Sequence, residues 1–86
     1  MKYDKIGFPK EQSYVVVLTD AHVNPNYIGI LSYGNEHALV LTNAQNIMDI
    51  CPTDKGLEFL LNKEEGIPLR LDMTRVIGIG EIQKLK

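Results

Sequence analysis

Apolar residues recur along the chain in short runs that are separated by polar residues, glycine and proline. The first run is SYVVVLTD, residues 13–20, and its three successive valines favour an extended strand with both faces at least partly covered. Residues 21–26 are dense in turn formers, and YIGILSY, residues 27–33, is the second predicted strand. HALVLTNAQNIMDI, residues 37–50, is the third predicted strand and is long enough to bend.

The last third of the chain predicts two further strands, IPLRLDM at residues 67–73 and RVIGIGEIQK at residues 75–84. Residues 52–66, which precede them, allow two interpretations. Thr53 or Asp54 would cap a short helix in one of them. In the other, the run GLEFLLN is a strand.

Five short strands with tight turns and little helix predict a mostly β fold, a small five-stranded and strongly bent antiparallel barrel. We expect residues 13–86 to form this single domain, and residues 1–12 to form an irregular arm with at most a short helical turn. A glycine inside a strand often marks a sharp bend or the close approach of another backbone. Gly29, Gly78 and Gly80 are therefore predicted where the sheet bends over itself.

The chain has 86 residues, enough for one small domain with a modest core. Domains of this size often need a disulfide, a metal or oligomerisation for stability. Cys51 is the only cysteine, so no disulfide forms within the chain, and one cysteine with two histidines does not make a structural zinc site. Next to Pro52, Cys51 is expected to be a small, partly buried residue. Self-association is the remaining way to gain stability.

The formal net charge is −2, from nine Lys and Arg against eleven Asp and Glu. This balance excludes a protein that coats nucleic acid by charge alone, although it allows a local basic spot. No segment approaches the roughly 20 apolar residues that span a membrane, and the start of the chain, MKYDKIGF, has no apolar run of signal-peptide length. We expect a cytoplasmic protein that does not contact membranes.

The second and third predicted strands resemble the first signature of the Sm-like family. That signature is an aromatic-x-Gly-x-Leu segment, then an Asp after three residues, and then Met-Asn after two more. Residues 27–31, YIGIL, match the opening, and Asn35 stands at the Asp position. Ala38 and Leu39 stand where Met-Asn is usual. Because Leu39 replaces the Asn that reads a base in that family, it argues against sequence-specific RNA recognition.

The fourth and fifth predicted strands resemble the second Sm-like signature, an apolar pair, Arg-Gly, Asn or Asp, and a short apolar strand. Residues 69–72 are LRLD and precede VIGI at residues 76–79, so Arg70 is present, Leu71 replaces the Gly and the turn is longer. The resemblance covers about residues 13–83. It implies an Sm-like barrel, of the SH3-like architecture, with two open sheet edges.

The resemblance further implies a homo-oligomeric ring of five to seven subunits. In it, the fourth strand of one copy pairs with the fifth strand of the next. An open edge exposes unpaired N–H and C=O groups, and chains that stay monomeric place charges or proline there. The fifth strand, VIGIGEI, carries only Glu81. The expected interface residues are Arg70, Leu71, Val76, Ile77 and Ile79.

The same resemblance places the tip of the hairpin between the second and third strands at the central pore. His37 would stack on a base and Asn35 would hydrogen-bond to one. Arg70 would stack or contact phosphate, and Arg75 takes this role if the turn is longer. The implied ligand is single-stranded RNA, rich in U or A.

The alternative function is a protein-interaction scaffold, in which the ring or small barrel does not bind RNA. The net negative charge of the chain and the presence of Leu39 favour it. An enzyme is not expected, because no nucleophile stands beside a base at a diagnostic spacing. GIGEI at residues 78–82 lacks the third glycine of a dinucleotide loop. No cofactor or metal is implied.

Overall fold

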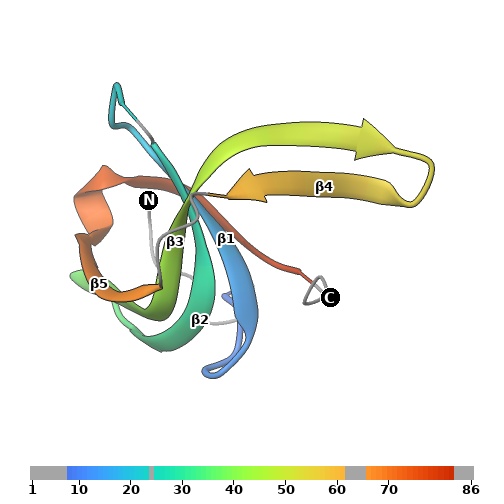
Figure 1. Cartoon of the computed structure of the whole chain (residues 1–86). Helices are drawn as coiled ribbons and strands as arrows, with labels where there is room; N and C mark the ends of the chain where they lie inside the picture. Colours follow the sequence, from blue (N-terminus) through green and yellow to red (C-terminus); the bar gives the residue numbers. More distant parts are fainter. Residues whose placement is uncertain (1–7, 24, 62–65, 83–86) are drawn as a thin grey trace.

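The computed structural model describes residues 8–23, 25–61 and 66–82 (Figure 1). The described segments form antiparallel strands joined by turns and one 3-10 turn, which confirms the predicted mostly β class. The elements are β1 (Tyr14–Thr19), β2 (Asn26–Gly34), β3 (Ala38–Thr53), β4 (Gly56–Leu61), β5 (Ile67–Asp72), η1 (Met73–Arg75) and β6 (Val76–Glu81).

The strands β5, β3, β2, β1 and β6 lie side by side in this order in a strongly curled sheet, a half-barrel (Figure 1). All of their pairings are antiparallel. The expected small, bent five-stranded barrel is therefore confirmed. The strand β4 was not among the five strands of that barrel, and it pairs with the distal half of β3 in a hairpin that projects from the barrel (Figure 1).

Residues 52–66 form a strand and not a helix over their described part. Thr53, considered as a helix cap, instead closes a tight turn: its hydroxyl accepts from Lys55 N at 3.2 Å and donates to Gly56 O at 3.1 Å. Gly56 has a φ of 116°, which a side chain would strain. Residues 57–61 then pair with β3, while residues 62–65 lie outside the described residues.

The core lies inside the curl of the sheet and takes alternate residues from its strands. In β1, Val15 and Val17 are fully buried and Val16 is half-buried, as the run of three valines predicts. Burying a side chain of this size contributes about 1.5–3 kcal/mol. The fully buried side chains are Val15, Val17, Ile28, Leu31, Leu39, Leu41, Met73 and Val76.

Gly29 lies where β2 approaches β3 most closely. The pairing of the two strands shifts register between Ile28 and Ile30. A Cβ atom on Gly29 would lie 3.0 Å from the carbonyl oxygen of Thr42 and 3.1 Å from the Cα of Ala44. The predicted close backbone approach at Gly29 is therefore confirmed.

The two glycines of β6 do not show such a close approach within the described part of the chain, and a bend at these positions stays a prediction. A Cβ on Gly78 would meet Leu18 at an ordinary 3.6 Å, and a Cβ on Gly80 would meet no described atom within 4 Å. These glycines lie on an outer strand, where no second backbone crosses over them.

The strand β3 bends at Asn43, which confirms that this long strand does not run straight. Asn43 has a φ of 52°, and the pairing with β5 shifts register between Leu41 and Ala44. Asparagine tolerates this left-handed conformation better than most residues, and an extra residue in one strand bends it. The bend lets β3 leave the barrel and continue into the hairpin with β4.

The described end of the N-terminal arm is tied to β2. Phe8 packs against the core next to Gly34, and Gln12 N donates to Leu31 O at 2.6 Å. Residues 8–12 contain a turn and no helix, and residues 1–7 lie outside the described residues. Over the described ranges, the structure contains no helix long and apolar enough to cross a membrane.

Candidate nucleic-acid interface

Asn35 holds the tip of the β2–β3 hairpin in shape. Its side-chain oxygen accepts from His37 N at 2.8 Å and from Ala38 N at 2.9 Å, and its amide nitrogen donates to the Tyr33 hydroxyl at 2.9 Å. Asparagine is suited to this because its short side chain closes turns by bonding to nearby backbone N–H groups. The oxygen of Asn35 and one of its two amide hydrogens are thus used within the turn, and only the second amide hydrogen remains for a ligand.

His37 presents its imidazole ring to solvent at this tip. Its side chain is 80% exposed, and its Nε2 lies 3.4 Å from a carboxylate oxygen of Glu36. The backbone of His37 is held in place, because its carbonyl oxygen accepts from Met73 N at 2.9 Å. A flat ring on an anchored backbone is suited to stacking, whereas the neighbouring carboxylate disfavours a phosphate at the same place.

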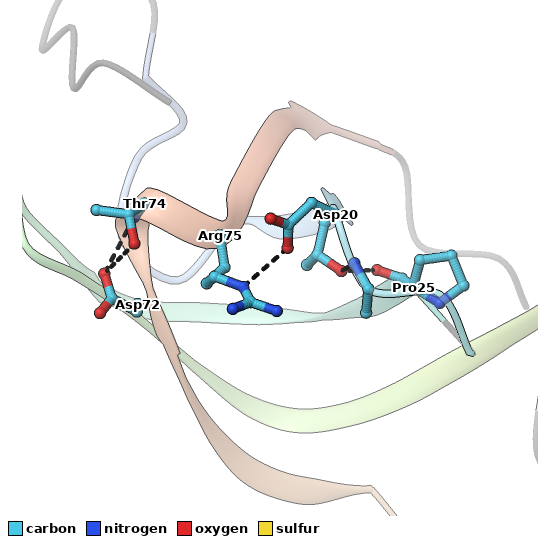
Figure 2. Close-up of polar contacts among 7 residues, drawn as sticks. Asp20, Pro25, Asp72, Thr74 and Arg75 are labelled. Carbon is cyan, nitrogen blue, oxygen red and sulfur yellow. Dashed lines mark hydrogen bonds and ion pairs between the residues drawn. The ribbon is translucent and has the colours of Figure 1, made fainter.

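Two sets of polar contacts, which we call clamps, hold the turn η1 in place (Figure 2). Asp72 accepts from both the backbone N and the hydroxyl of Thr74, each at 3.0 Å. Arg75 Nε donates to Asp20 Oδ1 at 2.9 Å, and Asp20 N donates to Arg75 O at 3.1 Å. The second clamp ties η1 to the end of β1 and occupies part of the Arg75 guanidinium.

A pocket of about 190 Å³ lies between the end of β1, the start of β2, the end of β5 and the turn η1. Its arginine and aspartate charges cancel formally, since two of each line it. Within the described ranges, Arg70 forms no hydrogen bond or ion pair, so its exposed guanidinium is available to a ligand. The lining residues are Thr19, Asp20, Ala21, Tyr27, Arg70, Leu71, Asp72 and Arg75.

The hydrogen bond from the backbone N–H of Thr74 holds the pKa of Asp72 below its ordinary value, with further lowering by the Thr74 hydroxyl, Arg70 and Arg75. The folded-state pKa therefore lies below the unfolded one. At pH values above the ordinary pKa of 3.8, the hydrogen bonds to the Asp72 carboxylate stabilise the folded state fully. This stabilisation is lost as the pH falls through the lower folded-state pKa.

We expect an NMR titration to place the pKa of Asp72 below 3.8 in the wild-type protein. Thr74→Ala removes the hydroxyl bond and keeps the backbone bond, so it should move this pKa part of the way back up. An equal pKa in both proteins would contradict the capping geometry.

The structure separates the four predicted RNA-binding residues into two groups. Asn35 and His37 lie at the hairpin tip, whereas Arg70 and Arg75 line the pocket. In the β3–β5 ladder Arg70 is paired with Val40, three residues from His37, or about 10 Å along the strand. His37 and Arg70 of one chain therefore do not face the same base, although the hydrogen bond from Met73 N to His37 O ties the hairpin tip to the turn η1, which follows β5.

Leu39 is fully buried in the core. At the position where Sm-like proteins carry a base-reading Asn, this chain therefore has a side chain that no ligand can reach. The predicted turn after Arg70 is also longer than the family pattern, because Arg70 lies inside β5 and Arg75 lies in the turn η1.

The predicted interface residues differ in exposure. Val76 is fully buried in its own core, so its side chain cannot contact a neighbour, and Leu71 and Ile79 pack partly against that core. Arg70 and Ile77 are exposed, Ile77 by 66%. Simple alternation of side chains does not explain why Ile77 and Ile79, two residues apart, differ. The β1–β6 register shifts between Leu18 and Thr19, which leaves Ile77 as an extra residue in β6 and turns its side chain outward.

Nothing in the sequence pattern assigns Asp20 and Tyr27 to the same site as the two arginines, although both residues line the pocket. The antiparallel β1–β2 pairing and the clamp to Arg75 bring them there. Cys51, expected to be partly buried, is exposed on the projecting hairpin, because β3 has left the barrel at that point.

No protein-family model matches this chain, and neither a curated protein nor a solved structure matches it significantly. The resemblance to Sm-like proteins therefore rests on the residues of the two motifs. In the described part of the chain, no three His, Cys, Asp or Glu side chains gather as a potential metal site.

Proposed function

We propose that the chain assembles head-to-tail into a homo-oligomeric, Sm-like ring that binds single-stranded RNA in the cytoplasm and is not an enzyme. The observation that supports this is the position of β5 and β6 at the two ends of the curled sheet. Among the described residues, β5 pairs only with β3 and β6 only with β1.

The two free edges share exposed apolar side chains, although β5 also contains Pro68, Arg70 and Asp72. Ile67 on β5 and Ile77 on β6 are both exposed apolar side chains. The strand β6 carries one charge, Glu81, and neither the lysine nor the proline that commonly blocks an edge. Pairing β5 of one copy with β6 of the next satisfies both edges, and such a contact closes into a ring when the rotation per step fits.

The proposal predicts that Ile77→Lys abolishes the ring, because a charged side chain would be placed in the edge contact. Light scattering should give the wild-type protein the mass of at least five chains and give Ile77→Lys a smaller mass. Val23→Lys is a matched control, since Val23 is also highly exposed but lies in the β1–β2 turn. A monomeric wild-type protein at high concentration would contradict the ring.

In a ring, one His37 and one Arg70 per chain become a closed circle of each. Stacking on an exposed ring typically contributes about 1–3 kcal/mol per base. Arg70 is exposed and has no ion-pair partner within the described ranges, so it can contact phosphate although each chain is net acidic. The two groups lie too far apart for one base and are suited to successive nucleotides.

We expect oligo-U or oligo-A RNA to bind more weakly as salt rises, because phosphate contacts release counterions. Arg70→Ala and His37→Ala should each weaken binding about tenfold, or about 1.4 kcal/mol. The mass of the oligomer should not change with His37→Ala, and it is measured for Arg70→Ala because Arg70 is also an expected interface residue. Lys55→Ala, in the turn of the projecting hairpin, is the control and should bind as the wild type does. Failure of the wild-type protein to bind either RNA at low salt would refute the RNA function.

A scaffold that binds protein and not RNA is the second candidate. It is favoured by the burial of Leu39 and by the balanced charges of the pocket that contains Arg70. A pull-down after nuclease treatment distinguishes the two functions, since only the scaffold would retain a defined protein partner.

A further inference from the structure

The projecting hairpin carries a third free edge. Among the described residues, β4 pairs only with β3. Its sequence, GLEFLL, contains one charge, Glu58, and no lysine or proline. Natural proteins commonly protect such an edge with a charge, a proline or a covering segment. Apart from Glu58, the described residues give the edge of β4 none of these protections.

A groove of about 620 Å³ lies beside β4 and the barrel. Tyr14 and Ile28 line it on the barrel, and the hairpin lines it with the apolar Leu57, Phe59 and Leu61 and with the charged Lys55 and Glu58. Leucines on the strand remain unusually exposed for their type, Leu57 by 59% and Leu60 by 54%. The free edge and this groove, which has both apolar and charged walls, therefore lie next to one another on the hairpin side of the molecule.

We propose that β4 pairs with β4 of a second copy of this chain across a two-fold axis, with the partner strand seated along this groove. The arrangement is independent of the proposed ring contact, since it uses neither β5 nor β6. It is an isologous contact, in which the same surface is used on both chains.

The charge pattern of β4 selects the register. A two-fold antiparallel pair places one residue directly opposite its own copy. Centring on Glu58 would set two carboxylates opposite each other, which is destabilising. Centring on Phe59 sets the two phenyl rings opposite each other, Leu57 opposite the partner's Leu61, and Glu58 opposite the partner's Leu60. This register matches apolar residues and keeps the like charges apart.

The size of the contact explains why the groove is needed. A ladder of five residues is only about 17 Å long. The strand by itself therefore buries much less than the roughly 800 Å² per partner of a stable interface. The half-buried Tyr14 extends the contact surface beyond the strand itself.

The register is tested by disulfide formation in a Cys51→Ser background, which removes the exposed native thiol. Phe59→Cys should give a disulfide-linked dimer under mild oxidation, because opposite Cα atoms lie about 4.5–5.5 Å apart. Glu58→Cys should not, because it faces position 60 of the partner and its own copy lies about 8 Å away. Equal linking of both variants, or none of Phe59→Cys, would overturn the proposed register.

A second measurement does not depend on replacing Phe59. The Ile77→Lys chain, whose ring edge is blocked, should have the mass of a dimer in light scattering. Adding Leu57→Lys should convert it to a monomer with an unchanged far-ultraviolet circular dichroism spectrum, because Leu57 is exposed on the projecting hairpin. A monomeric Ile77→Lys chain at millimolar concentration would overturn the proposal.

Discussion

Leu39→Asn is expected to unfold much of the protein and not to restore a base-reading side chain. Leu39 is fully buried in the core formed by β1, β2, β3, η1 and β6. Removing a large apolar side chain from such a site costs about 2–5 kcal/mol. A buried amide without a partner costs about 1–3 kcal/mol more. A chain of this length has a total stability of about 4–13 kcal/mol.

Chemical denaturation followed by circular dichroism measures this loss. Thr42→Asn is the matched control, since it introduces the same residue at an exposed position of the same strand and should change stability by less than about 0.5 kcal/mol. If Leu39→Asn has a free energy of unfolding within about 1 kcal/mol of wild type, Leu39 does not lie in the core. The position would then be open again as a candidate for base contact.

Gly29→Ala is expected to destabilise the fold by about 1–3 kcal/mol, as a core that is overpacked by one methyl group does. The new Cβ would lie 3.0 Å from the carbonyl oxygen of Thr42 and 3.1 Å from the Cα of Ala44. Both are backbone atoms of β3, so relief requires the strands to separate where their register shifts. A flexible side chain could move aside, but these atoms cannot without breaking the ladder.

Gly78→Ala provides the comparison for the same chemical change. Its Cβ would meet only the side chain of Leu18 at 3.6 Å, and its φ is not in the left-handed region. Here the loss of glycine's extra freedom in the unfolded chain should leave stability unchanged or raise it by up to about 1 kcal/mol. Similar destabilisation by both substitutions would mean that the close β2–β3 approach is not the reason for the glycine at position 29.

The free edges give one physical explanation for both proposed assemblies. The described core is small, and part of its apolar surface remains exposed at the three edge strands β4, β5 and β6. A small domain gains limited stability from its own core, and edge pairing adds backbone hydrogen bonds and buries such surface. Head-to-tail pairing of β5 with β6 would make a ring, and β4–β4 pairing would join two rings.

The sequence by itself determined the features that depend on local chemistry. Three successive valines favour a strand in any compact fold because their branched side chains suit a pleated sheet. Gly29 breaks an apolar strand, and a close backbone approach is the common physical reason for this. The number of barrel strands follows from the apolar runs that turn-forming residues separate. The bend of the third strand follows from the length of its apolar run.

Only the tertiary structure decided the features that depend on pairing between distant segments. GLEFLL is compatible with either a helix or a strand until β3 extends beyond the barrel and offers it a partner. Burial of Leu39, and the separation of His37 from Arg70, follow from the register of β3 with β5. A shift of one residue in that register would turn each side chain to the opposite face, and hydrophobic periodicity along one strand does not record which strand lies beside it.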